Sequence, residues 1–205
     1  MMNCLLVTDI FGDGPWLQQV RETIEPYAQI TCVSPYSSKQ AFDHEQQAYQ
    51  AYCQDCGHEN YLYKVRAALQ QLSTYTLALG FSAGASALWR ALSDYSGDHV
   101  QHFIGFYPGQ IRNALALNTQ ISTTLVFPSH ESHFDLVPVK SALRKKDKVE
   151  VLDSAWLHGF MNPCSEGFHV YGQKMGLEII EQKLMLMRES LMRAQEGGDI
   201  PAVQA

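Results

Sequence analysis

Short apolar segments alternate with helical patterns along most of the 205-residue chain. Successive parallel strands need a crossover connection, which is usually a helix, so this alternation favours an α/β fold. The strand-like segments span residues 4–8, 29–33, 76–81, 103–107, 123–127 and 148–152. The first of them, Cys-Leu-Leu-Val-Thr, is a continuous apolar run, which is typical of a strand buried on both faces. We therefore predict a mostly parallel sheet flanked by helices on both faces.

The segments between these strands have helical periodicity. In the first of them, Trp16, Val20 and Ile24 fall on one helical face. The predicted helices span residues 15–27, 41–52, 61–72, 83–92, 139–144 and 173–193. No repeat or low-complexity linker divides the pattern. Residues 1–195 are therefore expected to form a single domain, and residues 196–205 a flexible C-terminal tail.

Charge and hydropathy argue against several classes of partner. The net charge is −6, and the longest basic run is the three residues Arg144 to Lys146, so we expect no nucleic acid partner. No segment approaches the roughly 18 apolar residues of a membrane span, so no membrane association is expected. Residues 1–14 lack a basic leader, and the five cysteines are irregularly spaced. Both features predict a cytoplasmic protein.

The chain carries one candidate metal or redox motif, in which Cys53 and Cys56 are followed by His58. Zinc usually requires a second ligand pair at matched spacing, and none follows. We therefore interpret the two cysteines as helix-end residues and expect no metal. Neither of the glycine-rich nucleotide-binding patterns follows the first strand, so no cofactor is expected either.

The strongest functional motif is Gly80-Phe81-Ser82-Ala83-Gly84, which matches G-x-S-x-G. It lies between a predicted strand and a predicted helix, where this motif places a nucleophilic serine on a sharp turn. Small residues on both sides let the backbone pass closely enough to form the turn. The amide of Ala83, at the start of the helix, would then point to where an oxyanion forms. An ordinary glycine-rich turn is the alternative.

A serine hydroxyl needs a general base, and His158 is the best placed of the eight histidines. It follows the last predicted strand and precedes Gly159-Phe160, which puts it on a loop at the carboxyl edge of the sheet. The histidines at positions 99, 102, 130, 133 and 169 are interpreted as surface or turn residues.

The acid that orients His158 should follow the strand at residues 123–127. Glu131 lies four residues past that strand, and Asp135 lies just before a Val-Pro helix start. Asp135 also has the position of a helix cap, and Glu131 could be a solvated loop carboxylate. Distance from the strand slightly favours Glu131, but the sequence leaves both open.

Together these segments resemble the dienelactone hydrolase family of the α/β-hydrolase superfamily. The matching segments are Leu6–Gly12, Gly80–Gly84, Gly105–Tyr107, Asp135–Pro138 and His158–Phe160. They occur in the family's order and cover nearly the whole chain. The resemblance implies an α/β-hydrolase fold. Because only residues 109–121 follow the fourth strand before the fifth, we expect a minimal, lidless form with an open site.

The resemblance also implies roles for residues after the first strand. The amide of Ile10 would be the second oxyanion donor beside Ala83. Asp9 would fill the place of a family glutamate close to the nucleophile. Substrate contacts are expected from Asp9, Phe11 and Arg112, although a surface position is the favoured interpretation of Arg112.

Three departures from the family narrow the expected chemistry. Many members carry cysteine at the nucleophile, and Ser82 favours ordinary esters. Asp9 is shorter than the family glutamate and has less reach. The archetypal enzyme also has an arginine shortly after the histidine, where this chain has Met161-Asn162-Pro163, which argues against dienelactone itself as substrate.

The sequence therefore predicts a serine hydrolase that cleaves a small carboxylic ester, lactone or thioester through an acyl-serine intermediate. Its expected partner is a small-molecule ester-type substrate. The alternative is a catalytically silent α/β-hydrolase scaffold that binds a small molecule or a protein.

Overall fold

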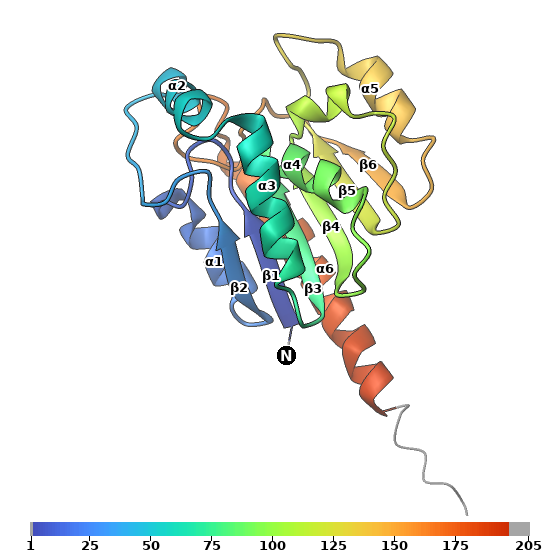
Figure 1. Cartoon of the computed structure of the whole chain (residues 1–205). Helices are drawn as coiled ribbons and strands as arrows, with labels where there is room; N and C mark the ends of the chain where they lie inside the picture. Colours follow the sequence, from blue (N-terminus) through green and yellow to red (C-terminus); the bar gives the residue numbers. More distant parts are fainter. Residues whose placement is uncertain (1, 197–205) are drawn as a thin grey trace, which may run out of the picture.

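The computed structural model describes residues 2–196 and contains one six-stranded parallel sheet (Figure 1). The strands are β1 (Met2–Val7), β2 (Ala28–Val33), β3 (Thr76–Phe81), β4 (Val100–Phe106), β5 (Ser122–Phe127) and β6 (Val149–Asp153). Their spatial order is β2-β1-β3-β4-β5-β6, and every neighbouring pair is parallel. The predicted parallel sheet is confirmed. Since all six strands run the same way, their carboxyl ends meet at one edge of the sheet.

Helices cover both faces of this sheet. They are η1 (Pro15–Leu17), α1 (Gln18–Ile24), α2 (Glu45–Asp55), α3 (Gly57–Gln70), α4 (Ala83–Leu92), η2 (Gly109–Asn113), α5 (Leu136–Leu143) and α6 (Val170–Glu196). In β1, Leu5 and Val7 pack with α3 and α4, whereas Cys4 and Leu6 pack with α1 and α6. Successive side chains of a strand point to opposite faces, so a strand buried on both sides needs a continuous apolar run.

Several boundaries differ from the predicted ones for local reasons. Helix α2 begins at Glu45 because the His44 side chain caps it by accepting a hydrogen bond from the amide of Gln47. The short helix η2 was not predicted, because its five residues are too few for a periodic pattern. Helix α6 runs to Glu196 and extends beyond the sheet (Figure 1), and the rest of the predicted tail, 197–205, lies outside the described residues.

No helix within residues 2–196 combines the length and the apolar character needed to cross a membrane.

His102 is buried, which corrects its interpretation as a surface or turn residue. It lies in β4, and its Nε2 is 3.0 Å from the hydroxyl of Thr124 in β5. That hydroxyl donates in turn to Glu150 in β6, at 3.0 Å. Burial, assisted by the positive charge of Lys183, lowers the pKa of His102 from 6.5 to about 3.

Burial of His102 predicts a loss of stability in mild acid. Between its unfolded pKa of 6.5 and its folded pKa of about 3, only the unfolded chain binds the proton. The contribution of the neutral, buried His102 ring to the free energy of unfolding is therefore complete above the unfolded pKa. It decreases as the pH falls below that value. From about pH 7.5 to about pH 5 it decreases by up to about 2 kcal/mol. Urea unfolding at both pH values should show this extra loss in the wild type and not in His102→Gln. Equal losses in the two proteins would contradict the assignment.

Candidate active site

Ser82 occupies a strained turn between β3 and α4. Its backbone has φ 47° and ψ −111°, a region that non-glycine residues rarely adopt. Its amide donates to the carbonyl of Phe106 in β4, at 2.9 Å, which ties the turn to the neighbouring strand. The predicted bounds of β3 and α4 agree with the structure, so the serine lies at the carboxyl edge of the sheet as predicted.

The two glycines of the motif are required by close backbone contacts. A Cβ atom on Gly80 would lie 2.7 Å from the Cα of Ala85, inside the first turn of α4. A Cβ atom on Gly84 would overlap the carbonyl oxygen of Thr8, just past β1. Neither backbone can move away cheaply, because both belong to the packed core. The motif spacing therefore follows from how tightly α4 packs over β1 and β3.

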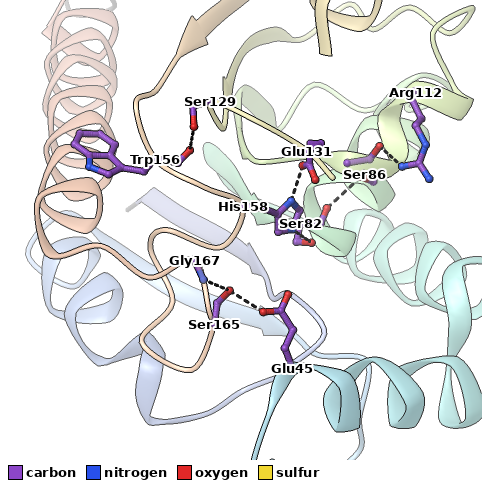
Figure 2. Close-up of polar contacts among 11 residues, drawn as sticks. Glu45, Ser82, Ser86, Arg112, Ser129, Glu131, Trp156, His158, Ser165 and Gly167 are labelled. Atoms are coloured by element: carbon purple, nitrogen blue, oxygen red, sulfur yellow. Dashed lines mark hydrogen bonds and ion pairs between the residues drawn. The ribbon is translucent and has the colours of Figure 1, made fainter. Parts of the chain in front are cut away.

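Three side chains from separate loops form a hydrogen-bonded chain (Figure 2). The hydroxyl of Ser82 lies 2.8 Å from Nε2 of His158, and Nδ1 of His158 lies 2.6 Å from Oε1 of Glu131. The side chain of His158 is 28% exposed and that of Glu131 only 10%. The carboxylate is thus shielded from water where it contacts the imidazole, and the imidazole remains open toward the cleft.

Asp135 has a different environment from Glu131. Its carboxylate accepts a hydrogen bond from the amide of Val137 at 2.9 Å and caps the N-terminus of α5. Among residues 2–196 its side chain makes no hydrogen bond or ion pair with His158. The structure therefore brings Glu131, and not Asp135, to the histidine.

Ile10 and Ala83 line the same cleft as Ser82. Within the described part of the chain, neither amide donates a hydrogen bond. The peptide that carries the Ile10 amide is held from its other side, because the carbonyl of Asp9 accepts from the Thr8 hydroxyl at 3.1 Å and from the Gly12 amide at 3.2 Å. Two unused, fixed donors beside a serine can stabilise an oxyanion.

Asp9 is a buried carboxylate on the wall of this cleft. It accepts hydrogen bonds from the amide of Phe11 at 2.9 Å and from the side chain of Asn162 at 2.7 Å. Burial raises the pKa of Asp9 to about 7 in spite of these two donors. Asn162 was not predicted as a site residue. Its link to Asp9 joins residues 153 positions apart, and no local pattern indicates it.

Arg112 and Phe11 also line the cleft. The guanidinium of Arg112 donates to the carbonyl of Gly109 at 2.7 Å and lies over the ring of Phe134, with its central carbon 4.5 Å from the ring centroid. Arg112 forms no ion pair among the described residues. The structure thus places the half-buried side chain of Arg112 on the wall of the cleft, and its expected contact with a substrate stays a prediction.

A second unpredicted contact anchors the loop that follows His158. Glu45, at the start of α2, accepts from the hydroxyl of Ser165 at 3.1 Å (Figure 2). It also accepts from the amide of Glu166 at 3.2 Å. Helix α2 and this loop thus form one wall of the cleft. The cleft has a volume of about 620 Å³, a size typical of small-molecule sites.

The cysteine motif lies at the junction of two helices. Cys53 is exposed in α2, and Cys56 is buried between α2 and α3. No group of three or more potential metal ligands occurs within residues 2–196.

Comparison with known proteins identifies the fold. No family model matches the sequence, and no curated protein matches it either. Solved structures of α/β-hydrolases do match. A dienelactone hydrolase-like promiscuous phosphotriesterase from metagenomic libraries has a TM-score of 0.67 at 12% identity, over 91% of this chain and 87% of that one. Est1E from Butyrivibrio proteoclasticus, with ferulic acid bound, has a TM-score of 0.64 at 10% identity, over 91% and 89%.

A third neighbour is the mouse α/β hydrolase domain-containing protein 10, with a TM-score of 0.61 at 10% identity, over 93% of this chain and 90% of that one. The chain therefore has the α/β-hydrolase fold, as predicted, and its neighbours include dienelactone hydrolase-like proteins. Identities of this size establish the fold alone.

Proposed function

We propose that this protein is a serine hydrolase that cleaves a small carboxylic ester, lactone or thioester through an acyl-serine intermediate. The observation that carries the proposal is the unbroken chain from the Ser82 hydroxyl through His158 to the shielded carboxylate of Glu131. An exposed serine with no such base would be a poor nucleophile at neutral pH. The hydrolases among the structural neighbours support a hydrolase in the broader sense.

The geometry supports a two-step mechanism. Nε2 of His158 takes the proton as the Ser82 oxygen attacks the carbonyl carbon, and Glu131 stabilises the imidazolium that forms. The amides of Ile10 and Ala83 bind the developing oxyanion. When the intermediate collapses, His158 returns the proton to the leaving group and leaves an acyl-serine. Water activated by His158 then hydrolyses the acyl-serine and regenerates the free hydroxyl.

The form of the cleft supports a small substrate. Strand β4 is followed by η2 and a short loop to β5, with no inserted lid domain in residues 107–121. The cleft combines apolar side chains such as Phe11 and Phe134 with the polar groups around Ser82. An open cleft of about 620 Å³ holds a compact ester better than a long acyl chain.

Covalent labelling tests this proposal directly. A fluorophosphonate probe reacts with an activated serine, loses fluoride and leaves a stable phosphonyl ester. We expect intact-mass analysis to show one adduct per chain and peptide mapping to locate it on Ser82. Absence of an adduct on protein with native circular dichroism would contradict the proposal. That result would favour a non-catalytic scaffold that binds a small molecule or protein.

A further inference from the structure

A second cavity of about 500 Å³ adjoins the catalytic cleft. The two cavities share three lining residues, His58, Ala83 and Gln110. Ala83 is also the residue whose amide is proposed above to bind the oxyanion. The second cavity therefore borders the cleft at the residue that follows Ser82, and it is lined by residues of α3, α4 and η2 and of the loop after η2.

His58 lies where the two cavities meet and offers a hydrogen-bond donor there. Its Nδ1 is 3.0 Å from the hydroxyl of Tyr52, which is fully buried. Burial and the positive charge of Arg90 lower the pKa of His58, so the ring is neutral near pH 7. Within residues 2–196 the Tyr52 hydroxyl makes no other hydrogen bond, so it donates to Nδ1. The ring proton then resides on Nε2, where a ligand can accept it.

The second cavity is polar without a net charge. Arg90 and Glu59 on its wall form two parallel hydrogen bonds, of 2.7 and 3.0 Å, and neutralise each other. The other lining residues mix small apolar side chains with uncharged polar ones. They are Ala83, Ser86, Ala87, Gln110, Asn113, Ala114, Ala116 and Leu117, together with His58. A lining that mixes hydrogen-bonding side chains with small apolar ones suits a neutral group that bears hydroxyls better than an ion or a hydrocarbon chain.

We propose that the second cavity is a substrate subsite that takes an uncharged, hydroxyl-bearing portion of the ester, such as a polyol or sugar group. This inference rests on the proposed function, because it assumes that an ester reacts at Ser82. It adds a substrate class, since a simple alkyl group could form no hydrogen bond with the polar side chains that line the cavity.

Matched pairs of esters test the subsite. On the alcohol side, glyceryl monoacetate is compared with propyl acetate, and on the acyl side, ethyl glycerate is compared with ethyl propanoate. Within each pair the molecules differ only in hydroxyl groups. The hydroxyl groups would form one or two additional hydrogen bonds in the subsite. We therefore expect the wild-type kcat/KM to favour the hydroxylated member of at least one pair by about tenfold.

Blocking the cavity should remove that preference. Ala116 is exposed and lines the second cavity but not the catalytic cleft, so Ala116→Trp fills the subsite at little cost to folding. The matched control is Ala194→Trp, at an exposed position on α6 outside both cavities. We expect the preference to fall to about one in Ala116→Trp and to persist in Ala194→Trp.

The possible failures are distinguishable. Equal rates within both pairs for the wild type, or a preference that survives Ala116→Trp, would overturn the subsite while leaving ester hydrolysis intact. No hydrolysis of any of the four esters, together with no fluorophosphonate adduct, would overturn the proposed function itself.

Discussion

Replacing Ser82 with alanine is expected to lower kcat/KM by at least about 10⁵-fold for any ester that the protein hydrolyses. The substitution removes the only oxygen positioned 2.8 Å from Nε2 of His158 among the described residues. Without it no acyl-enzyme can form, and only binding and the two amide donors remain to assist attack by water. The measurement is the initial rate with a chromogenic acetate ester. A high enzyme concentration makes a loss of about 10⁵-fold in kcat/KM measurable.

The matched control for this substitution is Ser93→Ala. Ser93 ends the same helix, α4, and its hydroxyl donates to the carbonyl of Arg90, away from the cleft. We expect it to keep wild-type rates, with circular dichroism and melting temperature measured for both variants. A Ser82→Ala protein that retains even a hundredth of the wild-type rate would show that the nucleophile is another group.

Replacing Glu131 with glutamine is expected to lower kcat by about 10³- to 10⁴-fold. The carboxylate holds the proton of His158 on Nδ1, at 2.6 Å, and so leaves Nε2 free to accept the serine proton. A glutamine amide turned toward Nδ1 donates instead of accepting and favours the opposite tautomer. The neutral amide also fails to stabilise the imidazolium. The loss should appear in kcat with little change in KM.

Asp135→Asn is the matched control for Glu131→Gln, because it makes the same change of carboxylate to amide in the same loop. Asn is as good a helix cap as Asp, so the bond from the Val137 amide and the start of α5 should persist. We expect a kcat within about twofold of the wild type, since Asp135 does not contact His158 in the described structure. A large loss in this variant and none in Glu131→Gln would reverse the assignment of the acid.

Elements with strong local signals agree best between sequence and structure. Strand β3 and helix α4 have the predicted bounds, Thr76–Phe81 and Ala83–Leu92. The glycines at positions 80 and 84 explain this agreement, because a side chain at either would collide with a neighbouring backbone. The turn around Ser82 is thus encoded in five consecutive residues.

Elements whose form depends on contacts distant in sequence were predicted less well. His102 was predicted to be a surface or turn residue, but it is buried, and Thr124 on the adjacent strand provides a partner for its ring nitrogen. The pairing of Asp9 with Asn162 and of Glu45 with Ser165 likewise joins segments more than a hundred residues apart. Arg112 lies at the cleft because η2 turns it back over Phe134.

The sequence by itself determined the α/β architecture and the position of the serine turn, because hydrophobic periodicity and steric demands of glycine act over a few residues. It placed His158 on a loop at the carboxyl edge by the order of the strands. It left two acids for one position, since Glu131 and Asp135 are both within reach of that edge. Only the tertiary structure separated them, because the direction of a loop side chain is set by what the loop packs against. Here the amide of Val137 holds Asp135, and His158 lies against Glu131.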